Sequence, residues 1–404
     1  MFSGTSIRFI RFIAVIGFLT LFLSGCAGKL NRAVDNYYSG QPDKALTLLS
    51  GNHWTGKKNK LLYLLEQGTI YHHQGDYLKS TDFFLDADRL IESYEQISIS
   101  EQTASLVGNE WLTSYKGEYS ERLWVHTYLM MNYMLLGQYD DALVEANRAL
   151  IRFEQYPRAL DQAYFTRALM ALSFSNVAED NDALLIYRQL ANDLSDKSAV
   201  AGDIVYHANR LGMMDLVETF RSLSPLRPSP HDGELVLFLS SGRIPEKLPG
   251  NFFLPPSIRF SFPYYGPYVE PYLPRLTLSD GVVFAQIRTD LGVVVEDSLD
   301  VRKARLMAKE GIRVTAKEAL AQAVGDRNDA TAEAVVRALF FLMEEADTRS
   351  WRTLPAQFLI VRIALPAGRH NIRVGMGVQP YRVDIPEFEL RPGQRQFFSL
   401  RFDR

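Results

Sequence analysis

Apolar residues recur three and four positions apart from about residue 30 to residue 225, and short segments that contain glycine interrupt this pattern. Such spacing is typical of amphipathic helices joined by turns. Proline is scarce until Pro225, so little in this stretch opposes helix formation. We therefore predict that residues 26–224 form an array of helices.

The composition changes at residues 224–230, where Pro225, Pro228 and Pro230 follow one another closely. Proline lacks a backbone N–H and has a fixed φ, so this segment cannot continue a helix. We place a domain boundary here, and the second domain is expected to cover residues 225–404.

The second region alternates between strand-like and helix-like patterns. Residues 234–239 form an apolar run typical of a buried strand, and residues 258–262 alternate between apolar and polar side chains. Further strands are expected at 281–287, 293–296, 357–364, 371–374 and 396–402, with a strand pair around Asp290-Leu291-Gly292 and a turn at 365–368. Helices are expected at 299–325 and 330–346. The prediction is an α+β domain with a β-rich C-terminal tail.

Two segments of the helical region share one pattern. The first copy consists of Gly68, Tyr71, Gly75, Tyr77, Ser80, Phe84 and Ala87, and the second, at identical spacing, of Met130, Tyr133, Gly137, Tyr139, Ala142, Ala146 and Ala149. The pattern resembles the tetratricopeptide repeat (TPR), a helix–turn–helix unit of about 34 residues. Small residues are then expected where two helices cross, aromatic rings should fill the gap between helices, and Gly75 and Gly137 should allow the turns.

Weaker copies flank these two. Residues 40–46 resemble the end of a repeat, and residues 161–194 and 198–223 fit two further repeats. The two main copies lie further apart than one repeat length, so an inserted helix or loop is expected around residues 98–118. The fold class predicted for the whole chain is an α-helical TPR-like repeat array followed by the α+β domain.

Composition excludes several classes of protein. Hydrophobic residues make up 47% and charged residues 23% of the chain, which is ordinary for a globular protein and argues against bulk disorder. The formal net charge of −3 lacks the basic excess expected of a nucleic-acid binder. The single cysteine cannot form an internal disulfide, so packing must stabilise the fold.

The N-terminus has the pattern of a bacterial lipoprotein signal peptide. Arg8 and Arg11 precede an uncharged apolar stretch at residues 12–23, which is shorter than the ~20 residues needed to cross a bilayer. The stretch ends at Leu23-Ser24-Gly25-Cys26, which resembles the lipobox cut by the lipoprotein signal peptidase. We therefore expect residues 1–25 to be removed and Cys26 to carry lipid, palmitate included.

Lipid on Cys26 would determine where the protein works. Two or more acyl chains hold a protein stably on a membrane, because each buried CH₂ contributes ~0.8 kcal/mol. The next residue is Ala27 and not aspartate, which in the Gram-negative sorting pattern that the segment resembles indicates the outer membrane. The expected location is the outer membrane, with the protein facing the periplasm.

A second resemblance extends over nearly the whole mature chain. Its motifs are Gly-Glu-Leu-Val at 233–236, Ala-Asp-Thr-Arg-Ser-Trp-Arg-Thr-Leu-Pro at 346–355, Leu-Pro-Ala-Gly at 365–368, and Tyr-His-His-Gln-Gly-Asp-Tyr at 71–77. Together they look like an uncharacterised family of proteobacterial TPR-containing outer-membrane lipoproteins. That family implies an architecture and a location, but no activity.

No pattern of catalytic or cofactor-binding residues stands out in the sequence. The seven histidines show no zinc-binding spacing, and His72 and His73 are adjacent on a predicted helix, so they should point in different directions. No G-x-S-x-G, P-loop or G-x-G-x-x-G motif occurs. We therefore expect no catalytic residue, no metal and no cofactor.

The densest polar segment covers residues 344–352 and follows an apolar predicted helix. It has two interpretations. In the first, Arg349 and Arg352 bind a carboxylate or phosphate. In the second, which we favour, Asp347 and Ser350 hold the chain as it leaves a helix, Trp351 fills the core, and the arginines pair with Glu344 and Glu345.

An aromatic segment also leaves two interpretations open. Its side chains are Phe260, Phe262, Tyr264, Tyr265, Tyr268 and Tyr272, with prolines between them. Such a segment can form a recognition surface, because tyrosine offers a large contact area at low entropic cost. It can equally be a rigid loop lying across its own domain.

These observations favour a scaffold over an enzyme. A TPR array has a concave groove that binds extended peptides or partner helices. The predicted function is a membrane-anchored, periplasm-facing adaptor that binds envelope proteins or peptides in the assembly or regulation of an envelope machine. The alternative is an enzyme, or an enzyme activator, in peptidoglycan or glycan metabolism.

Overall fold

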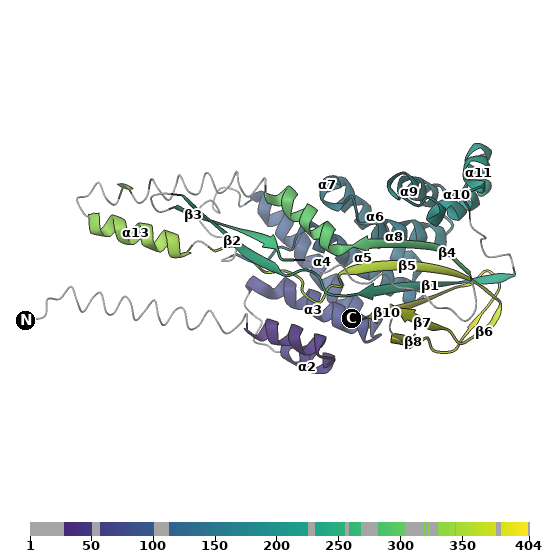
Figure 1. Cartoon of the computed structure of the whole chain (residues 1–404), viewed down its shortest axis with the longest axis horizontal. Helices are drawn as coiled ribbons and strands as arrows, with labels where there is room; N and C mark the ends of the chain where they lie inside the picture. Colours follow the sequence, from purple (N-terminus) through teal and green to yellow (C-terminus); the bar gives the residue numbers. More distant parts are fainter. Residues whose placement is uncertain are drawn as a thin grey trace, which may run out of the picture. The chain divides into compact units, whose positions relative to one another are not determined.

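The computed structural model describes residues 28–50, 57–100, 113–224, 231–254, 258–267, 282–303, 319, 322–323, 330–343, 345–376 and 381–402 (Figure 1). The chain divides into two compact units, Met1–Lys57 and Lys58–Arg404. Cys26 and the rest of the expected signal peptide lie outside the described residues, as do the proline-rich segment 225–230 and most of the expected insertion.

The first unit contains a pair of helices. One helix covers residues 28–38, and α2 (Pro42–Leu49) follows a turn at Gly40. Pro42 lies in the first turn of α2, where its missing N–H costs no hydrogen bond. Ala33 and Ala45 are fully buried, so the pair packs through small side chains, as expected for the end of a repeat.

Four helix hairpins open the second unit. Their helices are α3 (Lys60–His73) with α4 (Tyr77–Ser100), α5 (Tyr119–Leu135) with α6 (Tyr139–Gln155), α8 (Tyr164–Asn176) with α9 (Asp180–Asp193), and α10 (Ser198–Arg210) with α11 (Met214–Arg221). Two short elements, η2 (Lys57–Asn59) and α7 (Pro157–Leu160), accompany them. Each helix packs on the next hairpin helix in the series, so the prediction of TPR-like repeats is confirmed for this region.

The repeat pattern has a direct steric basis. Gly75 and Gly137 end their helices with φ of +80° and +72°, a conformation that favours glycine. A Cβ added to Gly68 would lie 2.8 Å from the ring of Phe84, so only glycine allows α3 and α4 to cross this closely. The Ser80 hydroxyl donates a hydrogen bond to the Gly68 carbonyl at 2.8 Å and fixes the crossing.

A four-stranded sheet follows, in the order β10-β1-β5-β4. The strands are β1 (Asp232–Ser241), β4 (Val282–Asp290), β5 (Gln357–Pro366) and β10 (Arg395–Phe402). β1 pairs parallel with β10 and antiparallel with β5, and a register shift interrupts β4 between Val283 and Ala285. Both faces of β1 are buried, which explains its continuous apolar run.

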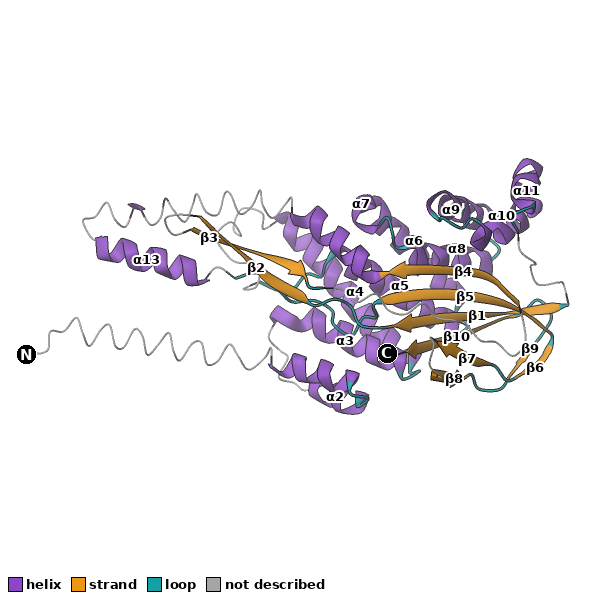
Figure 2. Cartoon of the chain, viewed as in Figure 1, coloured by secondary structure: helices purple, strands orange, loops and turns teal. Residues whose placement is uncertain are grey.

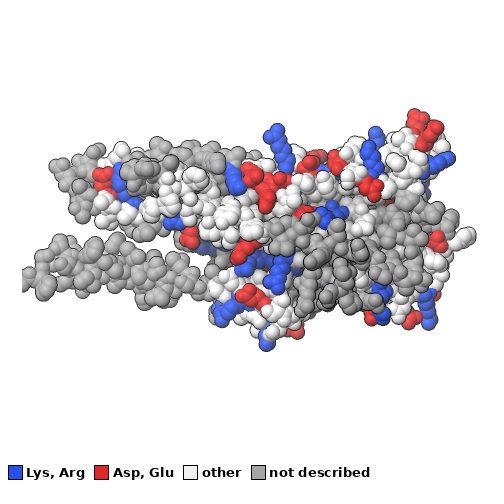
Figure 3. All heavy atoms as spheres, in the orientation of Figure 1, with Lys and Arg blue, Asp and Glu red and all other residues white. Residues whose placement is uncertain are grey.

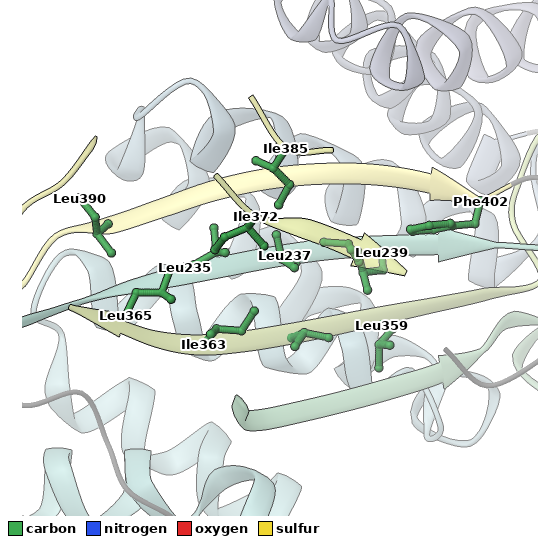
Figure 4. Close-up of a cluster of buried hydrophobic side chains, with 12 residues drawn as sticks. Leu235, Leu237, Leu239, Leu359, Ile363, Leu365, Ile372, Ile385, Leu390 and Phe402 are labelled. Carbon is green, nitrogen blue, oxygen red and sulfur yellow. The ribbon is translucent and has the colours of Figure 1, made fainter. Parts of the chain in front are cut away.

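One face of the sheet forms an apolar core (Figure 4). Leu235, Leu237 and Leu239 of β1 alternate with residues that point to the other face, as the period of a strand requires. Short strands supply the cover: β6 (Gly368–His370) pairs with β9 (Phe388–Leu390), and β7 (Arg373–Met376) pairs with β8 (Tyr381–Asp384). Separately, β2 (Lys247–Leu254) and β3 (Ile258–Tyr265) form a ribbon, and α13 covers Ala330–Met343.

The expected strand at residues 293–296 is wrong, because these residues belong to a helix that begins at residue 291. The Asp290 carboxylate accepts the backbone N–H of Gly292 at 2.9 Å and of Val293 at 3.4 Å, so it caps the helix. Buried Leu291, Val294, Val295 and Leu299 recur at helical spacing. The helix expected from residue 299 therefore starts earlier, and it is described to residue 303.

Candidate functional site

The inner face of the repeat array is covered by the sheet of the same chain. We use "inner face" for the surface formed by the first helix of each hairpin: α3, α5, α8 and α10. These helices pack on β10, β4 and β5 (Figure 2). The ring of Phe165 on α8 stacks on that of Phe358 at 4.8 Å, and the Phe165 N–H donates to Thr289 at 2.7 Å. The predicted peptide groove on this face is therefore occupied by strands of the protein itself.

Trp351 fills the space between the repeats and the sheet. Its side chain is 1% exposed, and its ring centroid lies 5.6 Å from those of Phe84 and Tyr128. The indole N–H donates a hydrogen bond to the Thr69 hydroxyl at 2.8 Å. The structure thus places Trp351 in the core, with Ser350 also buried.

Two buried glutamates on inner-face helices hold the backbone next to Trp351. Glu121 accepts the Trp351 N–H at 2.7 Å, and Glu66 accepts the N–H groups of Arg352 at 2.8 Å and Thr353 at 3.0 Å. Burial raises the pKa of Glu66 to about 7, against the lowering effect of these hydrogen bonds, and burial also raises the pKa of Glu121. Both carboxyls contact the chain itself, which makes them positioning groups of the fold.

A third buried carboxylate lies at the start of α5. Glu118 forms ion pairs with Lys247 of β2 and with Arg302. Burial alone would raise its pKa, but the two cations outweigh burial and lower the pKa to about 2. Glu118 thus remains charged at neutral pH and joins the repeats to two separate elements of the C-terminal region.

Arg349 is engaged within the protein. It forms an ion pair with Asp347 at 2.7 Å and donates to the carbonyl oxygens of Lys58 at 3.2 Å and Thr113 at 3.1 Å. Its partner is thus Asp347, while Glu345 is exposed and Glu344 lies outside the described residues. Burial is outweighed by Arg349, which lowers the pKa of Asp347. These contacts favour the structural interpretation of the segment.

A second polar network joins the last repeats to the sheet. Buried Arg362 of β5 forms ion pairs with Asp203 of α10, at 2.6 Å, and with Glu234 of β1. Glu234 also binds Arg395 of β10 at 3.0 Å.

A separate polar contact joins the first hairpin to β10. The two ring nitrogens of His72 lie 2.6 Å from Asn132 and 2.8 Å from Ser399. The sequence analysis gave none of these residues a packing role, although a charged residue in an apolar strand, such as Arg362, indicates buried pairing.

The predicted repeat-packing residues differ in how far they are buried. Phe84, Ala87, Ala142 and Ala149 are fully buried at the helix crossings. Tyr71 lies against Phe83, with ring centroids 5.3 Å apart, and Tyr139 is 6.0 Å from Phe397. Tyr77 and Tyr133 are partly buried, and their pKa values are raised by burial.

The aromatic segment is a β-ribbon in its described part. Phe260 and Phe262 lie on β3 with parallel rings, Tyr265 is buried, and Tyr264 is exposed. Phe252 on β2 is 71% exposed. Tyr268 and Tyr272 lie outside the described residues, so the two interpretations of the whole segment stay open.

The described residues contain no group of three or more His, Cys, Asp or Glu side chains that could hold a metal ion. Within the same part of the chain, no helix combines the length and the apolarity that a membrane crossing demands. The perturbed carboxyls described above are all buried and bonded to the protein itself.

Comparisons with known proteins found weak similarity to solved structures and no family. No family model and no curated protein matches the chain. Among solved structures, MamA from Desulfovibrio magneticus RS-1 is 14% identical, with a TM-score of 0.33 over 48% of this chain and 90% of that one. A protein from Podosopora anserina described as a kinesin light chain with nearly identical TPR-like repeats is 13% identical, with a TM-score of 0.34 over 49% of this chain and 93% of that one. Scores this low carry no argument, so the TPR-like architecture rests on the helix hairpins themselves.

Proposed function

We propose that this protein is a lipoprotein scaffold that binds protein partners in the assembly or regulation of an envelope machine. Lipid on Cys26 holds it at the outer membrane, and the folded part faces the periplasm. It has no catalytic activity of its own. The proposal does not use the inner face of the repeats for partners, because the sheet covers it.

The observation that carries this proposal is the distribution of apolar side chains on the outer helices. Val144 and Ile151 on α6 are 53% and 50% exposed, and Leu185 on α9 is 51% exposed. Single exposed apolar residues are normal, but these three lie on helices that flank the same groove. A surface of this kind is typical of protein–protein contacts.

Photo-crosslinking in cells of the species that makes the protein tests this proposal. A photoreactive amino acid replaces Val144 or Leu185 in the full-length chain, and the control position is exposed Arg369 on β6, on the sheet side of the protein. We expect protein adducts from the two outer-helix positions and none from Arg369. Absence of protein adducts at both outer positions would contradict a scaffold function.

A further inference from the structure

The outer face of the repeats is hollowed between α6, α8 and α9. The groove has a volume of about 380 Å³. Its floor is apolar and comes from three helices: Phe153 of α6, Met170 of α8 and Ile186 of α9 are buried, and Leu150 is half-buried. Only side chains from two neighbouring repeats together form this floor, so the groove is a product of repeat stacking.

Three exposed polar side chains line the same groove. They are Glu154 of α6 and Gln189 and Asn192 of α9. Among the described residues, none of the three has a hydrogen-bond or ion-pair partner. One carboxylate and two carboxamides are therefore available to a ligand above an apolar floor.

Among the side chains that line the groove, acidic residues outnumber basic ones. Arg167 is its one basic lining residue, and this guanidinium already pairs with Asp193 and with Asp161 at 3.3 Å. It also lies over the ring of Phe153 at 5.0 Å, which fixes its position. Glu154 is the carboxylate left over. Figure 3 shows acidic and basic side chains interspersed along the upper edge of the molecule.

Apolar side chains extend the surface beyond the groove itself. Ile151 lies about one helical turn before Glu154 on α6, and Leu185 lies one turn before Gln189 on α9. Both are about half exposed. The combined surface is longer than one side chain, and its pattern of apolar floor, apolar flank and acidic rim suits an amphipathic helix.

We propose that this groove binds a basic amphipathic segment of a partner protein, which inserts an apolar side chain over Phe153, Met170 and Ile186 and places a lysine or arginine beside Glu154. Gln189 and Asn192 supply hydrogen bonds to polar groups of the segment. The inference rests on the scaffold function proposed above, and it assigns the chemistry of the partner.

Crosslinking with peptide mapping tests the groove in the full-length chain in its native cells. The photoreactive amino acid replaces Gln189, and the crosslinked partner segment is sequenced by mass spectrometry. We expect a segment with lysine or arginine among apolar residues at helical spacing. A segment without basic residues, or an adduct of lipid or glycan in place of protein, would overturn the inference.

A second experiment tests the groove by reversing the charge of Glu154. The segment found by crosslinking is synthesised as a peptide and titrated against the purified full-length chain by fluorescence anisotropy. Glu154→Arg should weaken binding about tenfold or more. Glu218→Arg, an exposed position on α11 outside the groove, should leave the affinity within about twofold. Both side chains are exposed, so both variants should melt like the wild type, and equal affinity of the two variants would contradict the proposed site.

The two proposals fail in different ways. If Val144 or Leu185 captures protein while Gln189 captures none, the scaffold function stands and the groove is wrong. If no position captures protein, both are wrong.

Discussion

The indole nitrogen of Trp351 lies 2.8 Å from the Thr69 hydroxyl, although 282 positions separate the two residues in the chain. This hydrogen bond joins the first hairpin of the second unit to the segment before β5. With Glu66 and Glu121 bonded to the adjacent backbone, it makes the repeats and the sheet parts of one core.

Trp351→Ala should therefore destabilise the repeats and the sheet together. The ring is fully buried, so the expected loss in the free energy of unfolding is ~3–5 kcal/mol. Urea unfolding followed by far-UV circular dichroism and by tryptophan fluorescence should give coincident transitions. Phe252→Ala removes an exposed aromatic ring and should change stability by less than ~0.5 kcal/mol. Separate transitions for the two signals would contradict a shared core.

Gly68→Leu should crowd the crossing of α3 and α4. Even a Cβ at this position lies 2.8 Å from the Phe84 ring, and overpacking of this kind costs ~1–3 kcal/mol. Thermal unfolding measures the effect. If the ring causes the clash, Gly68→Ala should be partly rescued by Phe84→Leu in the double variant. A Gly68→Leu protein that melts like the wild type would show that the helices do not cross here.

The free energy of unfolding should depend on pH through Glu66. Burial raises the pKa of its carboxyl from 4.5 to about 7 in the folded protein. Between these values the folded protein binds more protons than the unfolded chain, so stability falls as pH rises from about 4.5 to about 7 and stays lower above that. The loss attributable to Glu66 is about 3 kcal/mol.

Glu66→Gln has no carboxyl at this position, so its free energy of unfolding should not fall by this amount as pH rises. Urea unfolding of both proteins between pH 4.5 and pH 8 gives the difference between their free energies of unfolding at each pH. His72, whose pKa burial lowers to about 4, titrates in both proteins and cancels. Exposed Glu218→Gln should follow the wild type at every pH. Parallel curves for wild type and Glu66→Gln would show that the pKa of Glu66 is ordinary.

Arg349→Ala should lower the free energy of unfolding by ~1–3 kcal/mol, because buried Asp347 loses its cation and two carbonyl groups lose a donor. Arg352→Ala should cost less, since its guanidinium is 27% exposed and pairs with exposed Glu246 at the long distance of 3.7 Å. Differential scanning fluorimetry compares the two. Normal melting of Arg349→Ala combined with loss of a specific partner in a pull-down would instead support a binding site at this segment.

Cys26→Ser should abolish palmitate labelling and release the protein from the membrane fraction. The lipobox resemblance requires the thiol as the site of acylation, and serine cannot replace it. Metabolic labelling with a palmitate analogue and fractionation measure both effects. Unchanged labelling and outer-membrane fractionation would exclude the lipoprotein assignment.

Local patterns predicted the local structure. Gly75 and Tyr77 recur at the same spacing as Gly137 and Tyr139, and this pattern predicted the helix hairpins. It could do so because the left-handed turn and the close helix crossing each require particular side chains. The apolar run at residues 234–239 gave β1 for a similar reason. The strand predicted at residues 293–296 was wrong. A valine-rich run favours a strand, but the cap at Asp290 and the helical spacing of the buried apolar residues favour a helix.

The covered inner face could not be predicted in this way. It depends on pairing between β1 and strands more than a hundred residues away, and no local pattern specifies that. One signal was present: Glu66 is the only acidic residue of α3 and directly follows the apolar run at residues 61–65, which is typical of a buried carboxylate with a dedicated partner. The sequence does not show that its partner is the backbone at Arg352 and Thr353.

The position of β10 has a consequence for biosynthesis. This strand ends at Phe402, and it packs on α3 and α5, among the first helices of the second unit. Synthesis and export both proceed from the N-terminus, so the apolar surface of those helices stays uncovered until residues 395–402 have emerged. Exposed surface of this kind promotes aggregation during folding. The core between the repeats and the sheet is therefore complete only after β10 has joined the helices that were made first.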